Sequence, residues 1–180
     1  MADTVNGYKA SKTFAERAAW RIAAQRPDLV LVTLCPPFIF GPVLPLTGMS
    51  ISKGNVNQSN QQLLSAAMKN PLPPETVTFT WADVRDVAKA HVLALEEEKV
   101  QSSQRFVVAN GKFTWSGIRG IKDHGVLPEG SLDVVQPLFS LSTEKVETQL
   151  GLVWTPLEQT VKDTFASLHV PIGIGSTSDL

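Results

Sequence analysis

The chain has 180 residues, of which 43% are hydrophobic and 18% are charged, a composition that is typical of a globular domain and excludes intrinsic disorder. Sixteen basic and seventeen acidic residues give a net charge of -1, so no basic excess indicates a nucleic-acid partner. The single cysteine, Cys35, excludes an internal disulfide. The longest uncharged stretch, 29–52, is broken by prolines and predicts no membrane span. With no signal-peptide core at the N-terminus, we expect a cytoplasmic protein.

Helical and strand patterns alternate along the chain, which predicts an α/β fold. Asn6 is a good cap for a first helix at 7–25, whose small and apolar residues recur at helical spacing. The unbroken apolar run 29–34 predicts a strand that is buried on both faces, as in a parallel sheet. Further strands are expected at 76–81 and 105–109, and further helices at 58–69, 84–98, 115–122, 143–150 and 156–168.

The segments between these elements are irregular. The stretch 41–57 is rich in Gly, Pro, Ser, Thr and Asn, and loops of that length are usually functional or mobile. We interpret Asp83 as the cap of the helix that follows it and Asp86 as an ion-pair partner of Arg85. The stretch 134–140 is expected to be irregular or a short strand.

One pair of residues suggests chemistry. Tyr8 is the chain's one tyrosine, and Lys12 follows it by one helical turn, which places both side chains on one face. A tyrosine hydroxyl has an unperturbed pKa of about 10, and a nearby ammonium lowers that pKa because it favours the phenolate. Such a pair suits proton transfer to a carbonyl oxygen. Taken alone, however, the pair is better explained as a surface tyrosine beside a solvated lysine.

Four stretches in a fixed order change this interpretation. The first, Y-K-A-S-K followed by F-A-E at 8–16, resembles the active-site helix of the extended short-chain dehydrogenase/reductases. The stretches 35–42, 83–91 and 142–151 resemble that family's P-x-x-x-F-G-P turn, its D-V-R-D-V-A-x-A-H segment and its S-x-x-K-x-x-x-x-L-G helix. The resemblance spans about residues 5–168. It is nearest to ketone and aldehyde reductases similar to fungal methylglyoxal reductase and plant dihydroflavonol reductase.

The resemblance implies a reaction and a cofactor. In that family NADPH delivers hydride to a carbonyl carbon while the tyrosine donates a proton, so Tyr8 is expected to be the general acid. Lys12 is expected to hold the nicotinamide ribose and to tune Tyr8. The implied partner is a small-molecule carbonyl substrate, and no metal, nucleic acid or membrane is expected. The preference for NADPH over NADH rests on the resemblance alone.

The resemblance also assigns residues outside the first helix. Pro36 and Ile39 match positions that line the nicotinamide, mainly through their backbone. Ser59 matches a serine near the cofactor phosphates or ribose. Phe38 matches a position that faces the substrate, where an aromatic ring would shape an apolar pocket.

The half of the family's fold that holds the pyrophosphate is not evident in this sequence. A dinucleotide-binding fold needs a strand, a glycine-rich turn and a helix in succession. The G-x-G at 173–175 follows no good strand. We therefore expect a partial Rossmann-like parallel sheet in 1–110, the C-terminal half of a dinucleotide-binding domain with a substrate-side loop at 41–75. A small α/β substrate-binding part would follow at 111–170, and a flexible tail at 171–180.

Three functional interpretations follow. The first is an NADP-dependent oxidoreductase that acts on a ketone or aldehyde, seen as a truncated form that is inactive by itself. The second is a sugar-nucleotide epimerase or dehydratase of the same superfamily, although no basic cluster favours a pyrophosphate-bearing substrate. The third is a non-catalytic remnant or interaction module. Without the other half of the fold, the strand at 29–34 and the first helix would lack sheet neighbours. We therefore expect the isolated chain to be poorly stable or to associate through an exposed sheet edge.

Overall fold

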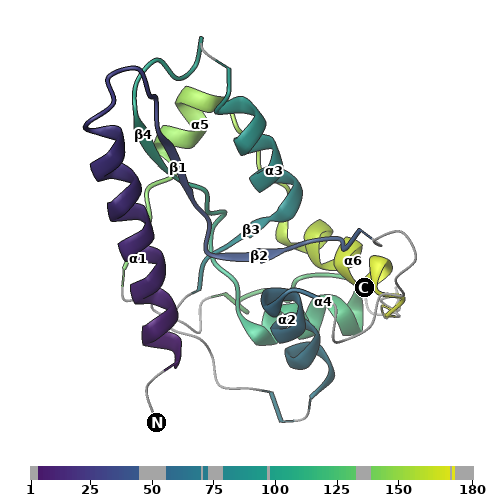
Figure 1. Cartoon of the computed structure of the whole chain (residues 1–180). Helices are drawn as coiled ribbons and strands as arrows, with labels where there is room; N and C mark the ends of the chain where they lie inside the picture. Colours follow the sequence, from purple (N-terminus) through teal and green to yellow (C-terminus); the bar gives the residue numbers. More distant parts are fainter. Residues whose placement is uncertain are drawn as a thin grey trace.

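Helices and parallel strands alternate along the chain, which confirms the predicted α/β class (Figure 1). The computed structural model describes residues 4–44, 56–69, 71–72, 79–96, 98–132, 139–170 and 172. Its helices are α1 (Thr4–Ala23), α2 (Gln58–Met68), α3 (Val84–Leu93), α4 (Trp115–His124), α5 (Glu144–Leu150) and α6 (Leu157–Ser167). Its strands are β1 (Val32–Cys35), β2 (Phe38–Phe40), β3 (Trp81–Asp83) and β4 (Gln104–Val107). Among the residues described, none of the helices combines the length and hydrophobicity that crossing a membrane requires.

The strands form two small parallel sheets. β1 pairs with β4, and β2 pairs with β3. Pro36 and Pro37 separate β1 from β2. Because proline has no backbone N–H for a sheet ladder, the chain leaves one sheet at this turn and joins the other.

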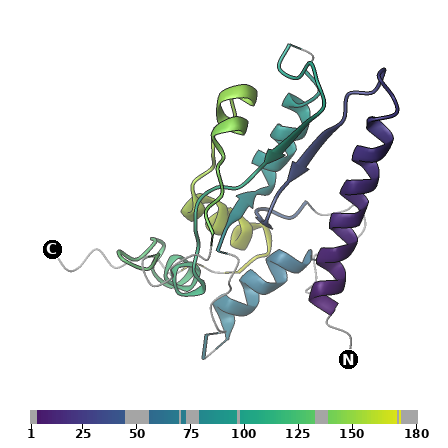
Figure 2. The same ribbon diagram turned by 90° about the vertical axis from the view of Figure 1, so that its left-hand side faces the viewer.

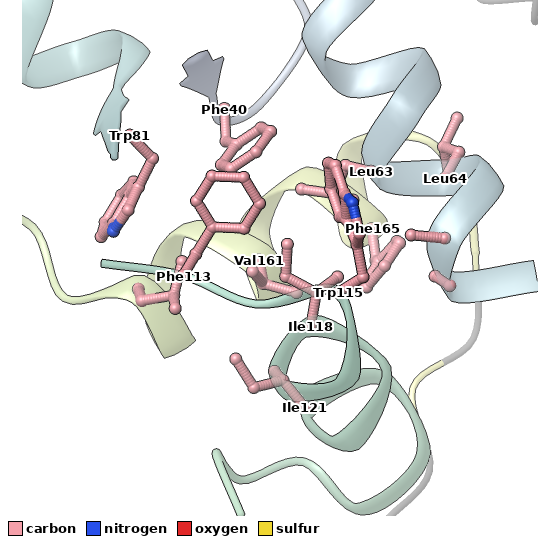
Figure 3. Packing of buried hydrophobic residues seen from close by; sticks show 13 residues of the cluster. Phe40, Leu63, Leu64, Trp81, Phe113, Trp115, Ile118, Ile121, Val161 and Phe165 are labelled. Atoms are coloured by element: carbon pink, nitrogen blue, oxygen red, sulfur yellow. The ribbon is translucent and has the colours of Figure 1, made fainter. Parts of the chain in front are cut away.

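One hydrophobic core lies where α2, α4 and α6 meet the β2–β3 sheet. Figure 3 shows the rings of Phe40, Phe113 and Trp115 close together at its centre. The ring centroids of Phe40 and Phe113 are 5.1 Å apart, and those of Phe113 and Trp115 are 4.9 Å apart. Burying one such large apolar side chain is worth roughly 1.5–3 kcal/mol, so this cluster holds the three helices to the sheet. A second core joins α3, α5 and β4 around Phe106.

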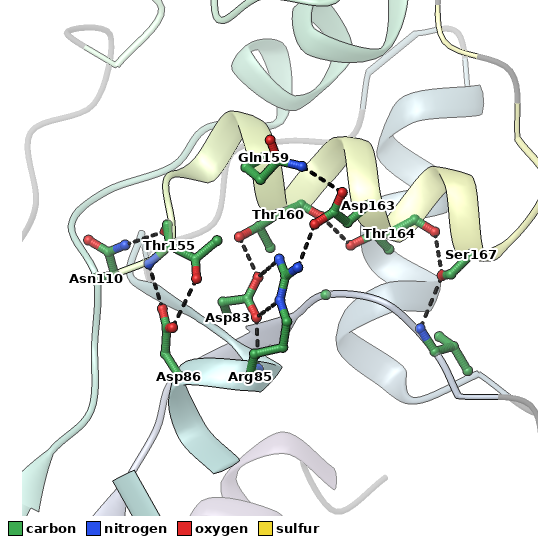
Figure 4. A network of polar contacts seen from close by, with 12 residues as sticks. Asp83, Arg85, Asp86, Asn110, Thr155, Gln159, Thr160, Asp163, Thr164 and Ser167 are labelled. Carbon is green, nitrogen blue, oxygen red and sulfur yellow. Dashed lines mark hydrogen bonds and ion pairs between the residues drawn. The ribbon is translucent and has the colours of Figure 1, made fainter. Parts of the chain in front are cut away.

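A buried carboxylate attaches the start of α3 to α6 (Figure 4). Asp83 is fully buried, and its side chain caps α3 by accepting a hydrogen bond from the backbone N–H of Arg85. The Arg85 guanidinium also binds the Asp83 carboxylate and reaches Asp163 of α6 at 2.5 Å. Thr160 of α6 donates to Asp83 at 2.6 Å. The predicted cap at Asp83 is confirmed.

The predicted ion pair between Asp86 and Arg85 is wrong. Asp86 instead accepts hydrogen bonds from the backbone N–H of Thr155 at 2.8 Å and from its hydroxyl at 2.9 Å. Adjacent residues on a helix do not face each other, so Asp86 and Arg85 reach different partners. Asp86 thereby fixes the segment that leads into α6.

β1 departs from its prediction in position and in burial. The predicted strand at 29–34 lies at Val32–Cys35, where all four residues are half-buried. Leu29 and Val30 are 42% and 49% exposed. Within the described residues, β1 has β4 on one edge and no strand on the other, while α1 lies along its outer side (Figures 1 and 2). An unbroken apolar run is typical of a strand that is buried on both faces. Because the residues of β1 are only half-buried, the predicted burial on both faces is wrong for this strand.

Other differences concern element ends. β2 was not among the predicted strands, because it follows two prolines that interrupt the extended pattern. The helix predicted to reach residue 98 ends at Leu93, and the strand predicted at 105–109 lies at 104–107. Parts of several predicted segments lie outside the described residues, namely 45–55, 70, 73–78, 133–138 and 173–180. The proposed division of the chain near residue 110 stays a prediction.

Candidate functional site

A cleft of about 810 Å³ lies beside α1 and brings distant segments together. α1 lines one side, and the end of β1, the Pro36–Pro37 turn, the start of α2 and part of β4 line the rest. Five of the six predicted site residues line this cleft, namely Tyr8, Lys12, Pro36, Ile39 and Ser59. Their roles stay predictions, but the fold gathers them in one place.

Tyr8 and Lys12 lie one turn apart on α1, as their spacing predicts. The Lys12 Nζ atom is 5.7 Å from the centroid of the Tyr8 ring, within the range of a cation–π contact. Tyr8 is 63% exposed, so a molecule in the cleft can reach it. The Ser11 hydroxyl donates to the backbone carbonyl of Tyr8 at 2.7 Å and is therefore engaged within the helix. The pair thus presents a phenol hydroxyl and an amine on the same wall of the cleft.

The opposite wall is built around the backbone of Ile39. The Ile39 N–H donates to the Ser59 Oγ atom at 3.4 Å, and the Asn57 side-chain amide donates to the Ile39 carbonyl at 3.3 Å. These bonds attach the start of α2 to β2, although the two segments are about twenty residues apart. The Ser59 hydroxyl accepts this bond and also lines the cleft.

Gly41 directly follows β2 in a conformation that favours glycine. The φ angle of Gly41 is 134°, and a Cβ atom built there would lie 2.6 Å from Val84 Cγ1. This close approach of β2 to the start of α3 explains a glycine at this point of the P-x-x-x-F-G-P-like turn.

Phe38 lies apart from this cleft. It is half-buried against the first core, with its ring centroid 5.5 Å from that of Phe113 and 6.1 Å from that of Trp115. It is not among the residues that line the cleft beside Tyr8. Its predicted role toward the substrate stays a prediction, while its observed contacts are those of a core residue.

The same cleft contains an ion pair between Glu16 and Arg105 that the sequence did not predict. The Oε1 atom of Glu16 on α1 accepts hydrogen bonds from Arg105 Nε of β4 at 2.8 Å, from Thr33 Oγ1 of β1 at 3.2 Å and from Trp20 Nε1 at 3.3 Å. The hydrogen bond from Arg105 outweighs the effect of burial and lowers the pKa of the Glu16 carboxyl. The signal in the sequence is the position of Glu16, one turn after Lys12, but its partner is 89 residues away.

Other candidate groups have structural explanations. The Cys35 thiol lines the cleft, but burial raises its pKa, so the nucleophilic thiolate is scarce near neutral pH. The His91 ring lies 2.8 Å from the backbone carbonyl of Val87, one turn earlier on α3. In the part of the chain that the structure describes, no three His, Cys, Asp or Glu side chains gather as metal ligands would.

Comparison with known proteins agrees with this geometry. Residues 1–109 match the NAD dependent epimerase/dehydratase family. Ketoreductase azaE of Aspergillus niger is 34% identical over 174 residues, which cover 89% of this chain and 50% of that protein. The NADPH-dependent methylglyoxal reductase GRE2 of Saccharomyces cerevisiae is 30% identical over 183 residues, which cover 93% of this chain and 52% of that protein. This chain thus spans about half the length of the curated relatives that it matches.

Solved structures show the same likeness. The crystal structure of Gre2 from Candida albicans in complex with NADPH matches 94% of this chain and 53% of its own, with a TM-score of 0.73 and 31% sequence identity. The predicted Rossmann-like α/β fold is therefore confirmed. The family match covers residues 1–109, which is more than half of the 180-residue chain and includes every residue that lines the cleft. The chain therefore belongs to the NAD dependent epimerase/dehydratase family.

Proposed function

We propose that this chain forms the part of an NADPH-dependent carbonyl reductase that carries the proton donor and one wall of the nicotinamide site. The observation that carries this proposal is that Tyr8, Lys12 and Ser59 line one cleft together with Pro36, Pro37 and Ile39. The names of the relatives, a ketoreductase and a methylglyoxal reductase, support reduction of a carbonyl group.

The cleft fits one end of the cofactor. The Lys12 ammonium, the Ser59 hydroxyl and the Asn57 amide are donors that suit ribose hydroxyls and the carboxamide of a nicotinamide. Pro36 and Ile39 offer an apolar wall for its ring. The described residues supply no glycine-rich turn leading into a helix, the element that binds a pyrophosphate in such folds. We therefore assign only the nicotinamide and its ribose to this chain.

The proposed chemistry is a two-electron reduction of a ketone or aldehyde. The bound cofactor supplies the hydride to the carbonyl carbon. Tyr8 donates its hydroxyl proton to the carbonyl oxygen, so that C=O becomes CH–OH. The adjacent Lys12 ammonium stabilises the phenolate that remains on Tyr8, and it binds the ribose. Thus the chain positions the carbonyl and supplies the proton.

The test is a reductase made by joining this chain behind the part of Candida albicans Gre2 that precedes the matched region. We expect it to oxidise NADPH when methylglyoxal or a simple ketone is added. A Tyr8→Phe substitution should lower kcat by about 10²–10⁴-fold, because it removes the proton donor. Lys89→Ala is the control, since Lys89 is exposed on α3 and lies outside the cleft.

Two results would contradict the proposal. Unchanged reduction by the Tyr8→Phe protein would show that Tyr8 is not the acid. Activity on nucleotide sugars together with none on simple carbonyls would favour the epimerase or dehydratase interpretation.

We also propose that the uncovered edge of β1 and the exposed apolar side of α1 bind the dinucleotide-binding half of such a reductase. Among the described residues β1 has one strand neighbour, and Phe14, Ile22, Leu29 and Val30 expose 63%, 59%, 42% and 49% of their surfaces. Open strand edges and adjoining apolar side chains favour association. The length of the relatives, about twice that of this chain, supports this occupant.

Light scattering tests this second proposal. The separately produced amino-terminal part of Gre2 should form a complex with this chain, and NADPH should tighten that complex. Val30→Lys should weaken the complex because it places a charge on the exposed apolar surface just before β1. Lys89→Ala, on α3, is a control. Formation of homodimers that exclude the Gre2 part would contradict the proposal.

A further inference from the structure

α1 is anchored to the rest of the chain along only part of its length. Every side chain from residue 6 to residue 15 is exposed, and half-buried side chains begin at Glu16 and continue with Ala18, Ala19, Trp20 and Ala23. The site residues of α1 all lie in the exposed part. Their positions therefore depend on how the second half of the helix is fixed to the sheet.

Glu16 is the residue of the anchored half that lies nearest to the site pair. Tyr8, Lys12 and Glu16 follow one another at intervals of four residues, so all three lie on one face of α1, and all three line the cleft. Glu16 is one turn from Lys12 and two turns, about 12 Å along the axis, from Tyr8. A helix is stiff over this length, so fixing the rotation of α1 at Glu16 also fixes the direction in which Tyr8 and Lys12 point.

The partners of Glu16 fix that rotation. Its Oε1 atom is bound by Thr33 of β1 and by Arg105 of β4, so one carboxylate oxygen joins the helix to both strands of a sheet. The side chains of Glu16 and Arg105 are 27% and 52% exposed, so the ion pair is partly shielded from water. Two strands that are themselves hydrogen-bonded to each other form a rigid base for this attachment.

Arg105 also keeps the Glu16 carboxylate from binding the Lys12 ammonium. A lysine and a glutamate four residues apart on a helix form a favourable ion pair. Without Arg105, the Glu16 carboxylate would attract Lys12 away from Tyr8. With Arg105 bound to Glu16 at 2.8 Å, the Lys12 ammonium stays over the Tyr8 ring at 5.7 Å.

We infer that the Glu16–Arg105 ion pair is a positioning device, which orients α1 on the sheet and keeps Lys12 available to Tyr8 and to a ligand in the cleft. The structural part of this inference stands on the contacts alone. Its consequence for catalysis rests on the proposed reductase function, so the two parts need separate measurements.

Hydrogen exchange on the chain itself tests the structural part. Arg105→Met should raise amide exchange in α1 by about two- to fivefold, the effect expected for loss of a partly exposed ion pair. Exchange in α4 and α6 should not change. Asp28→Asn is the matched control, because it breaks an ion pair of 2.7 Å with Arg26, just beyond α1, that does not touch the sheet. Unchanged exchange in α1, or an equal rise in all helices, would contradict the inference.

Kinetics in the fused reductase test the catalytic part. Arg105→Met should lower kcat by about tenfold to a hundredfold, as misplacement of catalytic groups does, with KM for the carbonyl changed less than about twofold. Adding Glu16→Gln to Arg105→Met should restore part of kcat, because it removes the carboxylate that competes for Lys12. A merely structural role predicts the opposite, a further loss in the double variant.

The outcomes separate the inference from the proposed function. If Tyr8→Phe abolishes reduction while Arg105→Met leaves both kcat and α1 exchange unchanged, the inference alone is wrong. If Tyr8→Phe leaves reduction intact, the proposed function is wrong, and the exchange experiment still decides whether the ion pair orients α1.

Discussion

The hydroxyl of Thr160 donates a hydrogen bond of 2.6 Å to the carboxylate of Asp83, although the two residues are 77 positions apart. Both side chains are fully buried. The bond attaches α6 to the junction of β3 and α3 (Figure 4). A carboxylate can be buried at low cost only if its oxygens are satisfied, and here Thr160 and Arg85 satisfy them.

Thr160→Val tests how much this hydrogen bond contributes to the stability of the fold. The substitution keeps the shape of the side chain but removes the donor to a buried carboxylate. We expect the free energy of unfolding to fall by about 1–3 kcal/mol in urea denaturation. Thr148→Val is the control, because its hydroxyl bonds to an exposed carbonyl on α5 and should change stability by less than about 0.5 kcal/mol. Equal losses in the free energy of unfolding for the two substitutions would show that the buried hydrogen bond contributes no more than the exposed one.

Two glycines should respond in opposite directions to alanine. Gly41→Ala should destabilise the chain by about 1–3 kcal/mol, because its φ of 134° is strained for alanine and the new methyl would meet Val84. Gly7→Ala should instead add about 0.5–1 kcal/mol, since Gly7 lies in α1 with nothing within 4 Å of the new methyl group. Thermal unfolding followed by circular dichroism measures both, and a stabilising Gly41→Ala would refute this account of the turn.

Acid should weaken the attachment of α6. Burial by itself raises the pKa of the Asp83 carboxyl, but hydrogen bonds from Arg85 and Thr160 outweigh burial and hold this pKa below its ordinary value of 3.8. A carboxyl whose pKa is lower in the folded state contributes stability above its unfolded pKa, and that contribution is lost as pH falls through the folded pKa.

The corresponding measurement is urea denaturation across the acid range. The free energy of unfolding should decline as pH falls below about 4. In Asp83→Asn, which cannot titrate at this site, the decline should be smaller. A variant whose pH dependence equals that of the parent chain would show that Asp83 does not contribute to the acid sensitivity.

Cys35 should react slowly with alkylating reagents. Burial raises the pKa of its thiol above the ordinary value of 9.0, and the thiolate is the reactive form. At about pH 8, iodoacetamide should modify the folded chain more slowly than free cysteine. The chain has no other thiol, so mass spectrometry reads the rate directly, and unfolding in guanidinium should restore the rate of a free thiol. Rapid modification of the folded chain would contradict the assigned environment.

The local elements of this protein follow from the sequence because their signals are short-range. α1 contains the predicted Tyr8–Lys12 turn, and Asp83 caps α3 as its position suggested. The predicted strand boundaries are less accurate, because the ends of a strand depend on the partner strands that it pairs with. The apolar run 29–34 predicts a fully covered strand, whereas β1 has one strand partner among the described residues. β2 was missed because its pairing with β3 joins residues more than forty positions apart, beyond any local pattern.

For the candidate site too, local spacing predicts some features, and tertiary packing decides the others. The sequence by itself determined the helical spacing that puts Tyr8, Lys12 and Glu16 on one face, because helix geometry is set by local periodicity. Only the tertiary structure decided which residues meet that face. It brought Arg105 to Glu16 and placed Phe38 against the first core and not along this cleft. Such contacts arise from the packing of segments that are far apart in the chain, and no local periodicity encodes their partners.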